Sequence, residues 1–157
     1  MSHEHHYSTS LKWTGNLGTG TSDYKAYSRN HNVWAPDKYA VISGSSDPHF
    51  RGDATRYNPE ELLVCALSQC HMLAYLHLCA VNKIVVVDYE DAASGTMVTE
   101  RDGSGKFTDV LLRPVVTVTA ESDAKLAAEL HHEAHRLCFI ANSVSFPVRH
   151  EPKIVSQ

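Results

Sequence analysis

Several features that would mark a particular class of protein are missing from the sequence. There is no net positive charge: the formal net charge is −4, which gives no electrostatic reason to expect nucleic acid or an anionic membrane as a partner. No apolar run approaches the roughly 20 residues that span a bilayer, and the polar start MSHEHHYSTS lacks the apolar segment of a secretory signal. We therefore expect a cytoplasmic protein that binds neither nucleic acid nor membrane.

Most of the short motifs of enzymes and metal sites are absent as well. The sequence contains no C-x-x-C pair, no G-x-G-x-x-G, no P-loop and no G-x-S-x-G nucleophile elbow, so we expect no nucleotide and no other cofactor. It does contain four cysteines, namely Cys65, Cys70, Cys79 and Cys138. Standing structural disulfides are not expected in a reducing compartment. Any cysteine chemistry should therefore be catalytic or redox-linked.

What the sequence does contain predicts one folded domain over residues 1–157, with residues 1–9 as a mobile tail. A chain of 157 residues with 43% hydrophobic residues can bury a real core. Alternation and turn residues predict the strands 10–16, 23–35, 38–44, 83–100, 106–120 and 146–156, and apolar periodicity predicts the helices 59–81 and 123–138. The turn 101–105 makes a hairpin of the two central strands. The fold class is α+β, with a largely antiparallel sheet.

The first helix has a strong start signal. Asn58 is placed to cap it, Pro59 suits the first helical position, and Glu60 and Glu61 put negative charge in the first turn. The helix is apolar on most faces, which is typical of a helix buried inside the protein or in a subunit contact.

Cys70 lies inside this apolar helix and has two interpretations. A buried cysteine often only fills space, and its pKa is raised unless a cation stabilises the thiolate. A functional Cys70 therefore needs a cation nearby. The candidates are Arg51 and Arg56 in the preceding loop, Arg29 on the second strand, and the adjacent His71.

Glu60 could orient such an arginine, but it is ten residues from Cys70. In one straight helix ten residues span roughly 15 Å, so Glu60 could not share a site with Cys70 of its own chain. Either the chain bends near Glu60, or a partner subunit donates a group. A glutamate that only serves the helix dipole explains this position equally well.

Cys138 ends the second helix, where His131, His135 and Cys138 follow one another at i, i+4 and i+7 on one face. With a fourth ligand this spacing could hold a transition metal, although an exposed polar stripe explains it more simply. Alternatively, Cys138 could pair with Cys70 if the two helices pack side by side. Cys65 and Cys79 point elsewhere on the first helix and are predicted to be core residues.

Two segments resemble motifs of a known family. NPEELLVCALSQCHM (58–72) is similar to the N-P-E-E/Q-L block and following cysteine of the OsmC/Ohr proteins, the osmotically inducible and organic hydroperoxide resistance group. EAHRLCFIANSV (133–144) is similar to the later A-x-x-x-C-P-x-S motif of that family. The order of elements agrees too, so the resemblance covers nearly the whole chain.

The resemblance implies a thiol peroxidase with an intertwined homodimeric fold and active sites at the subunit interface. Cys70 matches the peroxidatic cysteine, Cys138 the resolving cysteine, and Glu60 the glutamate that orients a catalytic arginine. That arginine corresponds to Arg51 by the OsmC pattern or to Arg29 by the Ohr pattern, and we favour Arg51. The implied substrate is an organic hydroperoxide, and the characteristic reductant of the Ohr branch is a lipoyl-type dithiol.

The sequence departs from the family pattern at two positions next to the cysteines. His71 replaces an aromatic residue and Phe139 replaces the proline, which suggests a separate OsmC-like branch. Two other interpretations therefore stay open. The protein could bind a metal or small ligand through His131, His135 and Cys138, or it could be a catalytically silent relative.

Overall fold

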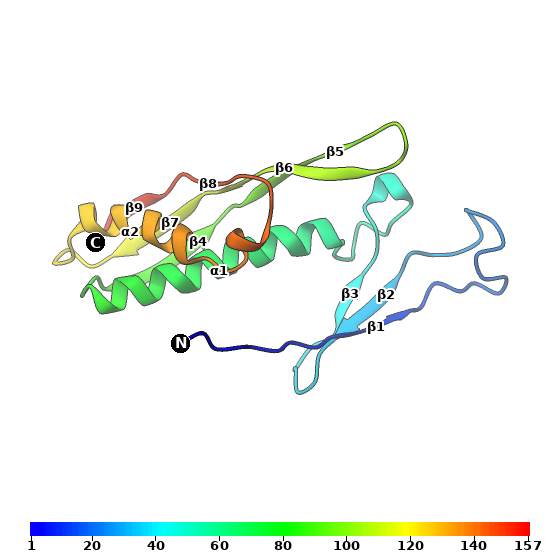
Figure 1. Ribbon diagram of the computed structural model, residues 1–157, viewed down its shortest axis with the longest axis horizontal. Coiled ribbons are helices and arrows are strands. Elements are labelled where there is room, and N and C mark those ends of the chain that lie inside the picture. Colours follow the sequence, from blue (N-terminus) through cyan, green and yellow to red (C-terminus); the bar gives the residue numbers. More distant parts are fainter. The chain divides into compact units, whose positions relative to one another are not determined.

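The computed structural model describes all 157 residues, and the chain divides into two compact units, Met1–Leu62 and Leu63–Gln157. The first unit carries a three-stranded antiparallel sheet of β1 (Ser10–Trp13), β2 (His31–Trp34) and β3 (Ile42–Gly44), in the order β1-β2-β3 (Figure 1). All three strands lie within the predicted ranges but are shorter.

The long strand predicted for 23–35 is wrong over 23–30. This segment forms turns in which the Asp23 carboxylate accepts the Lys25 N–H at 2.8 Å, the local hydrogen bonding that favours turns at Asp. The loop is tied back to β1 because the Trp13 indole donates to the Ser28 carbonyl at 2.8 Å.

The long helix α1 (Pro59–Val81) begins with the predicted cap. The Asn58 side chain accepts the Glu61 N–H at 2.8 Å, and the Glu61 carboxylate accepts the Asn58 N–H at 3.1 Å. This reciprocal pair is a capping box. A short 3₁₀ turn, η1 (Pro48–Phe50), precedes it and ends at Arg51, which has a left-handed backbone with φ of 64°.

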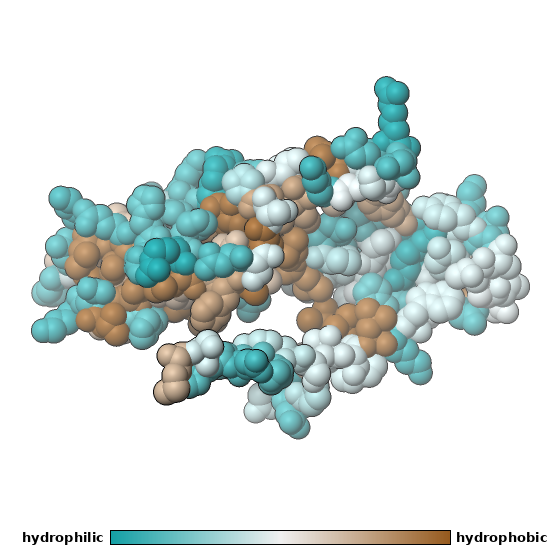
Figure 2. Space-filling view, viewed as in Figure 1, coloured by the Kyte–Doolittle hydropathy of each residue, from teal (hydrophilic) through white to brown (hydrophobic).

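One stripe of α1 is buried, at Leu67, His71, Tyr75 and Cys79. Much of the remaining apolar surface is exposed, with Leu73 61% exposed, and Figure 2 shows apolar side chains gathered along this helix. By length and composition α1 could cross a membrane, contrary to the expectation from the apolar runs. A single helix of this kind does not by itself indicate a membrane protein, because the core helix of a soluble protein has the same length and composition.

Each of the three long strands predicted for the second part of the chain is broken in two. The six strands are β4 (Val86–Asp91), β5 (Ser94–Thr99), β6 (Gly105–Leu112), β7 (Pro114–Val118), β8 (Val148–His150) and β9 (Lys153–Ser156). Pro114 and Pro152 lie at two of the breaks, where a residue without an N–H cannot continue a ladder. At the break before Pro114, the Arg113 N–H donates instead to the Asp91 carboxylate at 2.7 Å.

These strands form two sheets, in the orders β4-β7-β9 and β5-β6-β8. The predicted hairpin is confirmed as β5 and β6, which pair antiparallel. β6 pairs with β8 and β7 with β9 in parallel, so the sheets are mixed rather than antiparallel throughout. The α+β class is confirmed.

The second helix, α2 (Ala124–Leu137), is capped by Asp123, whose side chain accepts the N–H groups of Lys125 and Leu126. It shares a core with α1 and β7, built from Tyr75, Cys79, Val116, Val118, Ala127, Leu130 and Ala134 among others. A second core joins the first half of α1 to β6 and β8 through Leu67, Val110, Leu112 and Val148. The short turn η2 (Ala141–Ser143) follows α2.

Candidate functional site

The structure brings Cys70 and Cys138 together. Cys70 is half-buried on α1, and Cys138 is buried at the C-terminal cap of α2. The helices that carry them are joined by a hydrogen bond from the Tyr75 hydroxyl to the Ala127 carbonyl at 2.9 Å. Both cysteines are free thiols, and the Cys70 thiol lies close enough to Cys138 to raise its pKa.

Cys138 is held as a neutral thiol. Its pKa is raised to about 11, mainly by burial and in smaller part by the neighbouring Cys70 thiol. The Ala141 N–H, which donates to the Cys138 sulfur at 3.4 Å, opposes this shift. Because the thiolate is the nucleophile, Cys138 is poorly suited to attack first and better suited to react after its neighbour.

A buried pair of histidines lies beside the dithiol. His71 follows Cys70 on α1, and its Nε2 lies 2.9 Å from Nδ1 of His131 on α2, so that one ring donates a hydrogen bond to the other. The side chains are 1% and 0% exposed. His131 also stacks on Tyr75 with ring centroids 3.8 Å apart, and its Nε2 has no hydrogen-bond partner.

Burial keeps this histidine pair neutral. It lowers the pKa of His71 to about 4 and that of His131 to about 3, with smaller contributions from neighbouring histidines. His150 on β8 stacks against His71 at 5.5 Å and also has a lowered pKa, mainly through burial. His71 was predicted only as a candidate cation for Cys70 and as a departure from the family pattern, not as a partner of His131. His71 lies one turn from Leu67 and one turn from Tyr75 on the buried stripe of α1, but because this helix is apolar on most faces the sequence did not mark which face is buried.

The metal hypothesis for His131, His135 and Cys138 finds no support in their geometry. His131 is fully buried with Nδ1 bonded to His71, and the Cys138 sulfur faces Cys70 and the Ala141 N–H. His135 instead lies near His150, with ring centroids 5.7 Å apart. No three His, Cys, Asp or Glu side chains converge to hold a metal ion.

Glu60 lies in the first turn of α1, as expected, and α1 is unbroken from there past Cys70. The helix therefore has no break between Glu60 and Cys70. One carboxylate oxygen of Glu60 is buried and has no hydrogen-bond partner. A buried carboxylate oxygen without a partner is costly, which leaves Glu60 in need of a donor.

The arginines of the first unit differ in the hydrogen bonds and ion pairs that their guanidinium groups form. The Arg29 guanidinium donates to the carbonyls of Tyr27 and Tyr24, each at 2.7 Å, and lies over both aromatic rings. Arg56 bonds to the His31 carbonyl and lies near the Asp53 carboxylate. Arg51 is exposed, and its guanidinium takes part in no hydrogen bond or ion pair. Arg51 is thus the arginine available for another partner.

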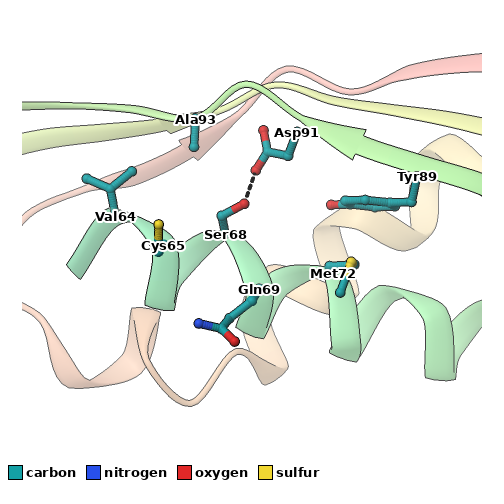
Figure 3. A pocket seen from close by; sticks show the side chains of 8 residues that line it. All are labelled: Val64, Cys65, Ser68, Gln69, Met72, Tyr89, Asp91 and Ala93. Carbon is teal, nitrogen blue, oxygen red and sulfur yellow. Dashed lines mark hydrogen bonds between the residues drawn. The ribbon is translucent and has the colours of Figure 1, made fainter. Parts of the chain in front are cut away.

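The remaining cysteines divide between core and surface. Cys79 is buried as predicted, whereas Cys65 is exposed, because the face of α1 that carries it is not covered. Cys65 borders a cavity of about 400 Å³ that is also lined by Val64, Ser68, Gln69, Met72, Tyr89, Asp91 and Ala93 (Figure 3). The Ser68 hydroxyl donates to the Asp91 carboxylate across it. Cys70 is not among the lining residues, so this cavity is not the dithiol site.

The chain belongs to the OsmC family. The family model described as OsmC-like protein matches residues 52–153, which include both cysteine segments. Over 95% of this chain and 99% of the other, the structure is similar to that of an OsmC-like protein of unknown function from Vibrio cholerae, with 32% identity and a TM-score of 0.84. No curated protein matches the chain.

More distant solved structures share the fold. An organic hydroperoxide resistance protein from Elizabethkingia anophelis is 15% identical with a TM-score of 0.70, and all of both chains is covered. An organic hydroperoxide resistance protein OsmC from Legionella pneumophila is 20% identical with a TM-score of 0.67, covering 96% of this chain and 98% of that one. The fold and family predicted from the two cysteine segments are confirmed.

Proposed function

We propose that this protein is a thiol peroxidase that reduces organic hydroperoxides to alcohols. The observation that carries the proposal is the pair of free thiols at Cys70 and Cys138, which two helices bring close together. Burial keeps the Cys138 thiol protonated. Two relatives in fold are named as organic hydroperoxide resistance proteins, which supports the same substrate class.

The chemistry takes two steps. The Cys70 thiolate attacks the peroxide, so that an S–O bond forms, the O–O bond breaks, and the alkoxide leaves and takes up a proton as the alcohol. Cys70 is then a sulfenic acid. The Cys138 sulfur attacks the Cys70 sulfur, the S–S bond forms, and the hydroxide leaves as water with the Cys138 proton. An external dithiol, of the lipoyl type in our proposal, restores both thiols by exchange.

Arg51 and Glu60 complete the site in this proposal. Arg51 has no other partner, and Glu60 has a buried oxygen without one, so each supplies what the other lacks. An arginine can fork between a carboxylate and a thiolate without losing its charge. Since α1 is unbroken and ten residues span roughly 15 Å, we propose that Arg51 and Glu60 serve Cys70 of a partner subunit in a homodimer.

The first experiment is a titration of the reduced protein with cumene hydroperoxide, followed by mass spectrometry. We expect a loss of two protons mapped to a Cys70–Cys138 link. Cys70→Ser should prevent the oxidation, whereas Cys138→Ser should leave a sulfenic acid that dimedone traps. If both thiols stay free in excess peroxide, the peroxidase proposal is wrong and a silent member of the family takes its place.

A mixing experiment tests the shared site. Cys70→Ser and Arg51→Ala should each be inactive alone. If the arginine acts across a twofold dimer, a refolded equal mixture should recover about one quarter of the wild-type activity, because half of the dimers are mixed and each has one intact site. No recovery would place the arginine and the cysteine in the same chain.

A further inference from the structure

The His71–His131 pair stands on the same two helices as the dithiol. On α1, His71 is the residue after Cys70, and on α2, His131 lies two turns before Cys138. Only two side-chain hydrogen bonds join the helices: the bond between the two imidazoles at 2.9 Å and the bond from Tyr75 to the Ala127 carbonyl. Together with the apolar core that the two helices share, the geometry of this pair sets how α1 approaches α2 beside the thiols.

We propose that the His71–His131 pair positions Cys70 against Cys138, and that its opening in acid separates the two thiols. This positioning role deepens the proposed function, and it rests on that function in one respect, namely that Cys70 and Cys138 form a disulfide. Neither histidine needs to touch the peroxide, so both are positioning residues.

The surroundings of the pair explain why a proton would open it. The titratable groups around it are His150 from β8, His132 and His135 from α2, and Tyr75 from α1, whose ring also meets Tyr89 of β4. Neither the two histidines of the pair nor the three around it form an ion pair or a hydrogen bond with a carboxylate. An imidazolium formed here would be an unpaired cation in the core, which is costly until water reaches it.

The shape of the hydrogen bond suggests a variant that keeps it without the titration. Asparagine places its amide near the Nδ1 position of a histidine and glutamine places its amide near Nε2. The double variant His71→Gln/His131→Asn can therefore preserve one hydrogen bond between the helices at the same atoms, with no group that takes up a proton. His132→Gln, a change at an exposed residue of α2, is the matched control.

The test uses 4,4′-dithiodipyridine and needs no peroxide. All proteins carry Cys65→Ser, because Cys65 is exposed. Cys70 displaces one thiopyridone and becomes a mixed disulfide. Cys138 then either attacks the Cys70 sulfur, releasing the second thiopyridone and closing the internal disulfide, or attacks a second reagent molecule and gives a double adduct. Both routes use the Cys138 sulfur, so its own titration cancels from the ratio of the two products, which mass spectrometry measures.

We expect the internal disulfide from the wild type at pH 7. Because the pKa of His71 is about 4, about half of the pairs should be open at the lowest pH at which the circular dichroism is still native, near pH 4. The ratio of internal disulfide to double adduct should therefore fall about twofold. His132→Gln should behave in the same way. The double variant should close the disulfide equally well at both pH values.

Two results would overturn the proposal. One is a wild-type ratio that does not fall between pH 7 and pH 4, which is decisive even if the double variant does not fold. The other is a double variant whose ratio falls as steeply as that of the wild type. If peroxide never oxidises Cys70 but the ratio falls as expected, the peroxidase proposal fails and the positioning role of the histidines stands.

Discussion

At the scale of single residues, the buried histidines make the stability of the protein depend on pH. In the unfolded chain a histidine takes up a proton near pH 6.5, whereas in the fold burial lowers the pKa of His71 to about 4 and that of His131 to about 3. Between pH 6.5 and about 4 the unfolded state thus binds more protons, so the free energy of unfolding falls as the pH falls.

The size of this effect can be measured by urea unfolding at pH 7 and pH 4.5. We expect the wild type to lose on the order of 1–3 kcal/mol more than His71→Gln/His131→Asn over this interval. The comparison removes the contribution of the carboxylates, which both proteins share. Equal losses in the two proteins would show that the histidines take up protons in the folded state as readily as in the unfolded one.

The two candidate arginines are distinguished by opposite effects on stability and activity. Arg29→Ala removes two hydrogen bonds to carbonyls and two stacked contacts with tyrosine rings, so we expect a loss of about 1–3 kcal/mol. Arg51→Ala removes no bond and should change stability by less than about 0.5 kcal/mol. We expect Arg51→Ala, however, to slow the oxidation of Cys70 by peroxide at least a hundredfold.

The measurement combines urea unfolding with stopped-flow oxidation by cumene hydroperoxide. Arg56→Ala is the control for charge, because Arg56 belongs to the same unit and already has partners. A wild-type oxidation rate in Arg51→Ala together with a slow rate in stably folded Arg29→Ala would reverse the assignment in favour of Arg29.

At the scale of the elements, the start of α1 depends on one side chain. Asn58 is buried and accepts the Glu61 N–H, while Glu61 returns a bond to the Asn58 N–H. Asn58→Ala removes the first of these bonds and should lower the free energy of unfolding by about 1 kcal/mol. Urea unfolding checks this, with Asn58→Asp as the control that keeps the cap. Equal stability of Asn58→Ala and the wild type would mean that packing alone fixes the helix start.

Elements with local signals were predictable, and those that depend on distant partners were not. The cap at Asn58 and the β5–β6 hairpin follow from residues adjacent in sequence. Two of the breaks in the long strands had local signals in Pro114 and Pro152, whereas the bond from Arg113 to Asp91 at one of them joins residues 22 positions apart. The bond between His71 and His131 joins residues 60 positions apart. Since α1 is apolar on most faces, the pattern could not show that His71 lies on the buried stripe.

At the scale of the whole molecule, α1 buries too little of its surface to stand alone. Only four of its 23 residues are buried, although its composition is that of a core helix, and Leu73 is 61% exposed. Water-exposed apolar surface of this kind is typical of a face that another molecule covers. The dimer in our proposal would cover it and would also bring Arg51 and Glu60 of one chain to Cys70 of the other.

The substitution Leu73→Glu tests this arrangement. A charge in an apolar subunit contact is costly, so the variant should elute as a monomer in size-exclusion chromatography with light scattering, whereas the wild type should be a dimer. Because Leu73 is exposed in the single chain, the charge should not disturb the fold of that chain. Cumene hydroperoxide should then oxidise Cys70 slowly, since the partner's arginine is missing. The control Lys125→Glu changes an exposed residue of α2 and should remain dimeric and active. A monomeric Leu73→Glu with full activity would show that one chain holds a complete site, and the unpartnered Glu60 oxygen would then need a donor from its own chain.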